Sequence, residues 1–198
     1  MKIGIFGGTF DPFTFAHLAI CEKVLEEGIV DKVIVLPTIV NWHREDKKSW
    51  LSYDDKFRVI MDMTWKCTDW RESIQPDFYE LSHADHDWDE TKITNRRYVH
   101  MLSDVTFRYG IDNEYYTVIG TDSLWNFIKW WNYNTIFDMS KLIVVKGRDG
   151  IDLPDETFGA IEVEIDPKFA EMSASKIRAR YAIVDEYLAD VMNRKLMS

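Results

Sequence analysis

The feature that most constrains this chain is a strand, loop, helix and strand pattern at its start. The apolar run IGIF at residues 3–6 predicts a buried strand, and the apolar spacing in 17–27 predicts a helix. Gly28 follows in the position where glycine commonly ends a helix, and the apolar run at 32–36 predicts a second strand. Two such strands joined by a helix form a βαβ unit, so we expect a parallel sheet with a right-handed crossover.

The remainder of the chain continues the alternation of strands and helices. Further strands are predicted at 78–81, 115–119, 142–145 and, nearer a sheet edge, 161–165. Helices are predicted at 53–65, 95–109 and 175–196, with mixed helical pieces across 124–136. This order indicates a Rossmann-like, doubly wound α/β fold with a mainly parallel sheet and helices on both faces. We expect one domain over residues 1–198 that binds its ligand beyond the carboxyl ends of the strands.

Composition and charge limit the classes of partner. The chain has 198 residues, of which 46% are hydrophobic, enough for a full core. Its formal net charge of −10 argues against a broad nucleic-acid interface, although a few local cations and N–H groups can still hold a small phosphorylated ligand. Neither a signal peptide nor a run of membrane-spanning length is found, so we expect a cytoplasmic protein with no membrane partner. Whether copies of the chain assemble stays open.

The loop after the first strand, GGTFDPFTFAH at residues 7–17, is suited to holding an anion. Gly7 and Gly8 let the backbone approach a ligand closely. The N–H groups at the start of the next helix favour a phosphate, and His17 and Thr14 can each donate a hydrogen bond to it. An ordinary glycine-rich turn before a capped helix is the alternative interpretation.

A second polar stretch, MSASKIR at residues 172–178, lies near the other end of the chain. Ser173 is placed as an N-cap, and Ser175 and Arg178 then project from the first turn of the last helix. Hydroxyl groups and a guanidinium at a helix start suit the outer phosphates of a nucleoside triphosphate. An ordinary capped helix with a surface arginine is again the alternative.

Together the two stretches resemble the motifs of the nucleotidylyltransferase superfamily, GGTFDP…(H/T)xGH and ISSTxIR. Members transfer a nucleoside monophosphate from a triphosphate to an acceptor phosphate and release pyrophosphate. Thr14 takes the H/T position, His17 is the final histidine, and Ala16 replaces the motif glycine.

The resemblance implies two groups of phosphate-binding residues. His17, assisted by Thr14 and by the backbone at Gly7, Gly8, Thr9 and Phe10, would hold the α-phosphate. The β- and γ-phosphates would be held by Ser173, Ser175 and Arg178. Arg44 would also face the phosphates, since Trp42-His43-Arg44 resembles the family's PHK/PHR.

The segment IGTDSLWNFIKWWNYNTIFDMSKLIVV at 119–145 resembles IGxDSLxxFxxWxxY…L(I/V)V of bacterial nicotinate mononucleotide adenylyltransferases. This resemblance implies that Gly120 and Asp122 meet sugar hydroxyls and that Trp130 lies beside the pyridine ring, with Trp131 as the candidate one residue away.

One family stretch, SYTxxTL, is only partly matched. Tyr98 matches its tyrosine and is expected to bind the mononucleotide, but Val99 stands where threonine is expected. Nicotinate and nicotinamide mononucleotide are therefore both open as acceptors. Arg96 or Arg97 is an alternative contact for a carboxylate or phosphate, against a solvated helix face.

The activity implied is transfer of AMP from ATP to a pyridine mononucleotide in NAD biosynthesis. Mg²⁺ is expected to be carried with ATP, with no metal bound by the protein itself. The acidic stretch 83–90 is expected to be a solvated loop rather than a metal site. Phosphopantetheine adenylyltransferase is the nearest alternative, because that group has threonine at the Thr14 position. A non-catalytic nucleotide-binding relic is another, supported by Ala16; a cytidylyltransferase is disfavoured because no RTEGIST-type element is found.

Overall fold

The strands of this protein form one sheet in which every pair of neighbours is parallel. The computed structural model describes residues 1–38, 50–79, 97–146 and 151–180. Its sheet has the order β3-β2-β1-β4-β5-β6. The strands are β1 Lys2–Gly8, β2 Lys32–Pro37, β3 Ile74–Pro76, β4 Glu114–Gly120, β5 Lys141–Lys146 and β6 Ile161–Glu164. The predicted parallel α/β fold is confirmed, as is the edge position of β6.

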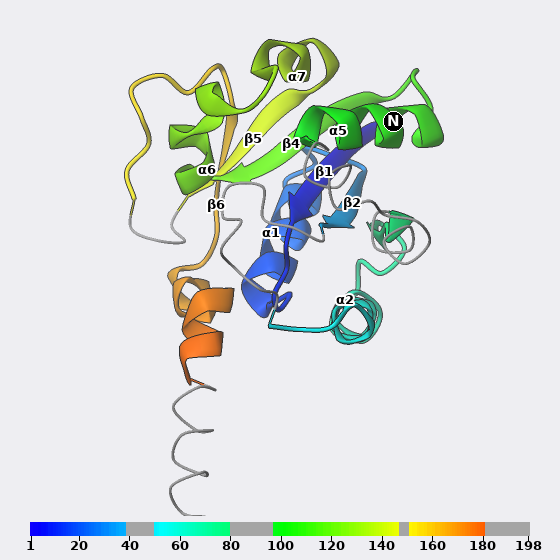
Figure 1. Ribbon diagram of the computed structural model, residues 1–198, viewed down its shortest axis with the longest axis vertical. Coiled ribbons are helices and arrows are strands. Elements are labelled where there is room, and N and C mark those ends of the chain that lie inside the picture. The colour runs from blue at the N-terminus through cyan, green and yellow to red at the C-terminus, as the bar shows by residue number, and fades with distance from the viewer. Residues whose placement is uncertain (39–49, 80–96, 147–150, 181–198) are drawn as a thin grey trace, which may run out of the picture.

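Helices cover both faces of the sheet (Figure 1). The helices are α1 Phe15–Glu26, α2 Tyr53–Lys66, α5 Tyr98–Tyr109, α6 Thr121–Trp125, α7 Tyr133–Met139 and the 3-10 helices η1 Phe127–Lys129 and η2 Pro167–Met172. Residues 174–180 are also helical. The described helices include none that is long and apolar enough to cross a membrane.

Two apolar cores, one on each face, explain why the central strands are apolar throughout. Phe6 joins the core under α1 and α2, whereas its neighbour Ile5 joins the core under α5, α6 and α7. The same alternation holds for Val35 and Leu36 in β2. A strand buried on both faces has no polar side, which gives the continuous apolar runs seen in the sequence.

One predicted strand is wrong in position. The third strand is Ile74–Pro76, four residues before the predicted 78–81, and it pairs with Val33, Ile34 and Val35. Residues 78 and 79 are not in a strand, and residues 80 and 81 lie outside the described ranges. Phe78 is apolar for another reason: its ring packs on Phe57 of α2, with ring centroids 4.5 Å apart. The other strands and helices lie within a few residues of their predicted bounds. Residues 181–196 of the predicted last helix and the stretch 83–90 lie outside the described residues.

The strand order brings β1 and β4 side by side at the centre of the sheet. Lys2 to Ile5 of β1 pair with Glu114 to Thr117 of β4. The connections run outward in opposite directions from this pair, so a crevice opens where they diverge, beyond the carboxyl ends of both strands. Ligands bind at such a switch point in open α/β sheets.

Candidate active site

A cavity of about 670 Å³ lies at this switch point. Its walls include most of the residues singled out in the sequence, namely Gly7, Gly8, Thr9, Phe10, His17, Tyr98, Gly120, Asp122, Trp130, Ser175 and Arg178. Polar groups from the opening loop and the last helix form one end. Aromatic rings from α5 and the segment after η1 form the other. Thr14 and Ser173 are not in the walls, and Arg44 lies outside the described residues.

The orientation of His17 is held by its own loop. The backbone N–H of Thr14, the N-cap of α1, donates to Nδ1 of His17 at 2.9 Å. Nδ1 therefore carries no proton, and the neutral ring has its proton on Nε2. The rings of Phe6, Phe10 and Phe13 surround the imidazole, with centroids 6.0, 5.2 and 5.3 Å away. His17 is 5% exposed, so its ring is confined to one direction on the cavity wall.

The structure places Thr14 behind His17, which differs from the expected contact with a phosphate. Its hydroxyl lies 2.9 Å from Nδ1 of His17, and the residue is 4% exposed. This arrangement makes Thr14 a residue that orients His17. Ala16 lies in the first turn of α1, is fully buried and is absent from the residues with positive φ. The methyl group that replaces the motif glycine hydrogen is therefore accommodated in the core.

The two loop glycines make room for aromatic rings. A Cβ on Gly7 would lie 3.3 Å from the ring of Tyr98, and one on Gly8 would lie 3.0 Å from the ring of Phe10. Neither glycine has a positive φ, whereas Phe10 does, at 40°. A side chain at Gly8 would therefore push Phe10 away from the His17 ring that it contacts.

Asp11, which the sequence analysis did not single out, ties the opening loop to two distant segments. Its carboxylate accepts hydrogen bonds from the backbone N–H of Trp50 at 2.7 Å and of Leu51 at 2.9 Å. Its backbone carbonyl accepts a hydrogen bond from Nη1 of Arg178. The only signal in the sequence was that Asp11 is the single acidic residue of the loop at 7–17. Asp11 therefore holds Arg178 against the polar end of the cavity.

The predicted N-cap of the last helix is confirmed. The backbone N–H of Lys176 donates to Oγ of Ser173 at 3.3 Å, and this hydroxyl lies 3.2 Å from Oγ of Ser175. Ser173 is buried beneath the cavity wall, whereas Ser175 is exposed and lines it. Of the two serines, Ser175 is the one placed to meet a ligand.

A buried lysine lies behind the polar end of the cavity. Lys56 of α2 is 1% exposed, and in the described segments its ammonium group makes no hydrogen bond. Burial lowers the pKa of Lys56; the charge of Asp11 opposes this effect and that of Arg178 adds to it. Lys56 was not among the site residues predicted from the sequence. The sequence did contain a signal that Lys56 is buried, because this residue lies on the same face of the helix as Ile60 and Thr64, which are also buried.

Tyr98 presents its ring to the cavity, because its hydroxyl is engaged elsewhere. The hydroxyl donates to Oγ1 of Thr117 at 3.1 Å, and Thr117 lies 2.7 Å from Oγ of Ser140. Burial raises the pKa of Tyr98. Its ring centroid lies 5.1 Å from that of Trp130. Trp130 and Trp131 both line the cavity, so both candidates for the aromatic contact are present.

The Gly120 and Asp122 turn lies where β4 ends and α6 begins. A Cβ on Gly120 would lie 2.8 Å from Oδ1 of Asp122, so a side chain at position 120 would move this carboxylate from its observed position. Asp122 is an exposed acceptor on the wall, as a group that binds sugar hydroxyls should be. Among the described residues, no three His, Cys, Asp or Glu side chains gather as metal ligands would.

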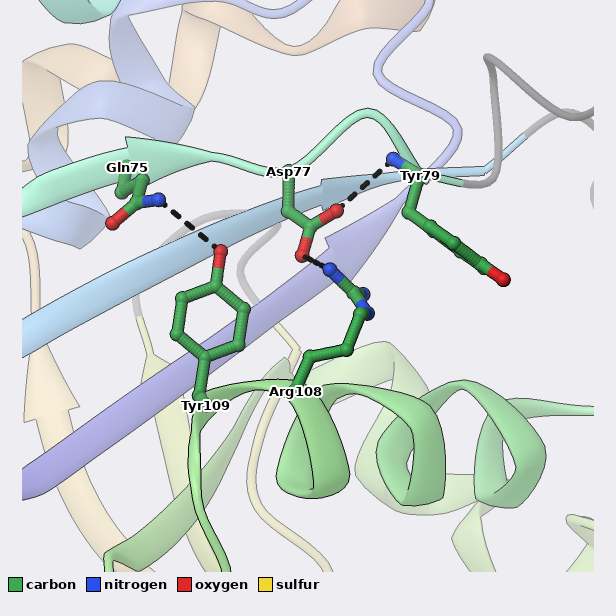
Figure 2. A network of polar contacts seen from close by, with 5 residues as sticks. All are labelled: Gln75, Asp77, Tyr79, Arg108 and Tyr109. Atoms are coloured by element: carbon green, nitrogen blue, oxygen red, sulfur yellow. Dashed lines mark hydrogen bonds and ion pairs between the residues drawn. The ribbon is translucent and has the colours of Figure 1, made fainter.

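Helix α5, which carries Tyr98, is fixed at its far end by a polar network (Figure 2). Arg108 pairs with the buried carboxylate of Asp77 at 2.5 Å, and Asp77 also accepts from the backbone N–H of Tyr79 at 3.0 Å. Nε2 of Gln75 in β3 donates to the hydroxyl of Tyr109 at 3.3 Å. These bonds join α5 to β3 and its following loop.

An open parallel sheet with a polar and aromatic cavity at its switch point is the architecture of nucleotide-binding α/β proteins. Within that class the chain belongs to the cytidylyltransferase-like family, whose model matches residues 5–180, and it is a nucleotidyltransferase.

Within this family the chain is similar in sequence to proteins named as adenylyltransferases. A "probable nicotinate-nucleotide adenylyltransferase" of Fusobacterium nucleatum is 25% identical over 200 residues, covering 99% of this chain and 95% of that protein. One of the same name from Campylobacter fetus is 33% identical over 158 residues, covering 78% and 76%. The resemblance expected from the motifs is confirmed.

A solved structure shares the fold. The nicotinic acid mononucleotide adenylyltransferase of Plasmodium falciparum, complexed with NaAD, matches with a TM-score of 0.69 at 14% identity, covering 90% of this chain and 82% of that one. At this identity the likeness concerns the fold alone.

Proposed function

We propose that this enzyme transfers AMP from ATP to nicotinate mononucleotide, or to nicotinamide mononucleotide, in NAD biosynthesis. The products are the dinucleotide and pyrophosphate. The observation that carries the proposal is one cavity with His17 and Arg178 at a polar end and Tyr98 and Trp130 at an aromatic end. A nucleotide phosphate chain and a flat pyridine ring can occupy these ends at the same time.

Catalysis of this reaction depends on positioning the two substrates and on stabilising the charge that develops in the transition state. A phosphate oxygen of the mononucleotide attacks the α-phosphorus of ATP. The bond from that phosphorus to the bridging oxygen breaks, and pyrophosphate leaves with the electron pair. No side chain has to act as a nucleophile.

Each phosphate has candidate donors in the cavity. The Nε2–H of His17 and the backbone at Gly8 and Thr9 would stabilise the charge that develops around the α-phosphate. Ser175 and Arg178 would hold the β- and γ-phosphates. Mg²⁺ enters as part of the substrate MgATP, since this ion commonly bridges phosphates and keeps few protein ligands.

The acceptor is supported by the names of the curated relatives and by the Trp130 and Tyr98 rings. An aromatic ring next to a cationic pyridine ring gains a cation–π attraction. Asp122 on the same wall would accept hydrogen bonds from the ribose.

The test is an acceptor screen that measures pyrophosphate release from MgATP. The enzyme is incubated with nicotinate mononucleotide, nicotinamide mononucleotide or phosphopantetheine, and ATP binding is measured separately by titration calorimetry. Release that depends on a pyridine mononucleotide supports the proposal. Release with phosphopantetheine alone assigns the protein to the alternative enzyme, and ATP binding without release with any acceptor indicates a non-catalytic protein.

A further inference from the structure

We propose that Arg97 recognises the acidic substituent of the pyridine ring and makes the enzyme prefer nicotinate over nicotinamide mononucleotide. This inference rests on the proposed function. It adds the residue that separates the two acceptors, which differ only in a carboxylate or a carboxamide on the ring.

Arg97 lies at the aromatic end of the cavity. It immediately precedes α5 and lines the cavity wall. The next residue, Tyr98, contacts Trp130 at 5.1 Å between ring centroids, and His100 contacts Trp131 at the same distance. The first turn of α5 therefore packs on the tryptophan pair. A cation at this place is near the ring of the acceptor, whereas Arg178 lies at the phosphate end, bonded to Asp11.

The guanidinium of Arg97 has donors available for a ligand. Within the described ranges its side chain makes no hydrogen bond or ion pair. Its backbone is engaged instead: the N–H donates to Nδ1 of His100 at 3.2 Å, and the carbonyl accepts from the backbone N–H of His100 at 2.9 Å and of Met101 at 3.3 Å. Lys129, another cation of this wall, already donates to Oδ1 of Asn126 at 3.0 Å. A half-buried arginine beside aromatic rings, with no acceptor for its guanidinium among the residues that the structure describes, is suited to an anionic ligand.

The chemistry of the two acceptors then decides the preference. A planar guanidinium can donate two parallel hydrogen bonds to the two oxygens of a carboxylate. A carboxamide offers only one acceptor oxygen, and its NH₂ group would face the N–H donors of Arg97. This mismatch weakens the binding of nicotinamide mononucleotide relative to nicotinate mononucleotide.

The side chain at position 99 cannot bind the carboxylate of the acceptor. Val99, which stands where the family has threonine, is buried in the core under α5 and is absent from the cavity wall. Its neighbour Arg97 supplies the polar group on that side. The backbone of Arg97 is well placed for it, because α5 is held by the Tyr98 to Thr117 hydrogen bond and by the Asp77 to Arg108 pair (Figure 2).

The experiment measures kcat/KM for the two pyridine mononucleotides with the full-length enzyme and its Arg97 variants. We expect the unaltered enzyme to prefer nicotinate mononucleotide. In Arg97→Gln that preference should fall about 10- to 100-fold, the range for a lost charge-assisted hydrogen bond. The KM for ATP should not change. Arg97→Lys keeps the charge without the planar fork and should retain part of the preference.

Arg58→Gln and Lys129→Gln are the control variants. Arg58→Gln removes a positive charge from the exposed side of α2 and should leave the preference unchanged. An active Arg97→Gln enzyme with an unchanged preference overturns the inference, as does a loss of preference in Lys129→Gln but not in Arg97→Gln. Failure of the unaltered enzyme with both mononucleotides instead overturns the proposed function, and the role of Arg97 with it.

Discussion

Arg178 donates a hydrogen bond to the backbone carbonyl of Asp11, a residue 167 positions earlier in the chain. This contact joins the last helix to the loop that follows β1. It is supported by η2, which packs against α1 and whose Phe169 reaches the core on that face of the sheet. The polar end of the cavity is therefore assembled from both ends of the described chain.

We expect Arg178→Ala to lower kcat/KM for ATP about 10- to 100-fold, because a charge-assisted contact to the outer phosphates is lost. The measurement is pyrophosphate release at varied MgATP. Arg180→Ala removes an exposed arginine from the same helix and should change little. Equal effects of the two substitutions would show that only the overall charge matters.

His17→Ala should lower kcat about 100-fold or more, the effect of removing a donor from a developing oxyanion. The fold should persist, since the three surrounding phenylalanines remain in the core. Circular dichroism and thermal unfolding check the fold, and pyrophosphate release checks the rate. A well-folded His17→Ala enzyme with ordinary turnover is incompatible with the assigned role.

Thr14→Val should lower kcat about 10-fold and leave the KM for ATP nearly unchanged, because the hydroxyl orients His17 and does not line the cavity. The backbone N–H of residue 14 still donates to Nδ1, so the loss is smaller than in His17→Ala. Thr14→Ser keeps the hydroxyl and should restore the rate. A large rise in KM would instead indicate direct contact of Thr14 with ATP.

Lys56→Met should weaken the dependence of stability on pH. The pKa of Lys56 is lowered in the folded state, so between this lowered value and the ordinary 10.5 the unfolded chain binds more protons. In this interval the free energy of unfolding of the unaltered protein rises with pH, and Lys56→Met should remove that rise. Urea unfolding from pH 7 to pH 10 measures it. Lys66→Met, at the exposed end of the same helix, should leave the rise intact.

Tyr109→Phe should reduce the loss of stability that the protein shows at alkaline pH. Burial, with the nearby Asp77, raises the pKa of Tyr109 to about 12 from 10.0. Such a group adds stability below pH 10 and loses it as pH rises through the folded value. The variant should therefore lose less stability than the unaltered protein between pH 10 and pH 12, as followed by urea unfolding. If the free energy of unfolding depends on pH in the same way in both proteins, groups other than Tyr109 cause the loss of stability at alkaline pH.

The sequence by itself determined the fold class and the general place of the site. Apolar runs such as IGIF and LIVV have the length and composition of buried strands, and a glycine is the last residue of both β1 and β4. Such signals are local, because they depend on residues a few positions apart. The motifs at 7–17, 119–145 and 172–178 named most of the residues that line the cavity.

Only the tertiary structure decided which partners these residues have. The hydroxyl of Tyr98 bonds to Thr117 and leaves its ring to the cavity. Lys56 lies inside the protein, where it feels the charges of Asp11 and Arg178. Phe78 packs on α2 and is not part of a strand. The physical reason is the same in each case: burial and hydrogen bonding depend on distances between segments far apart in the chain, which no local pattern encodes.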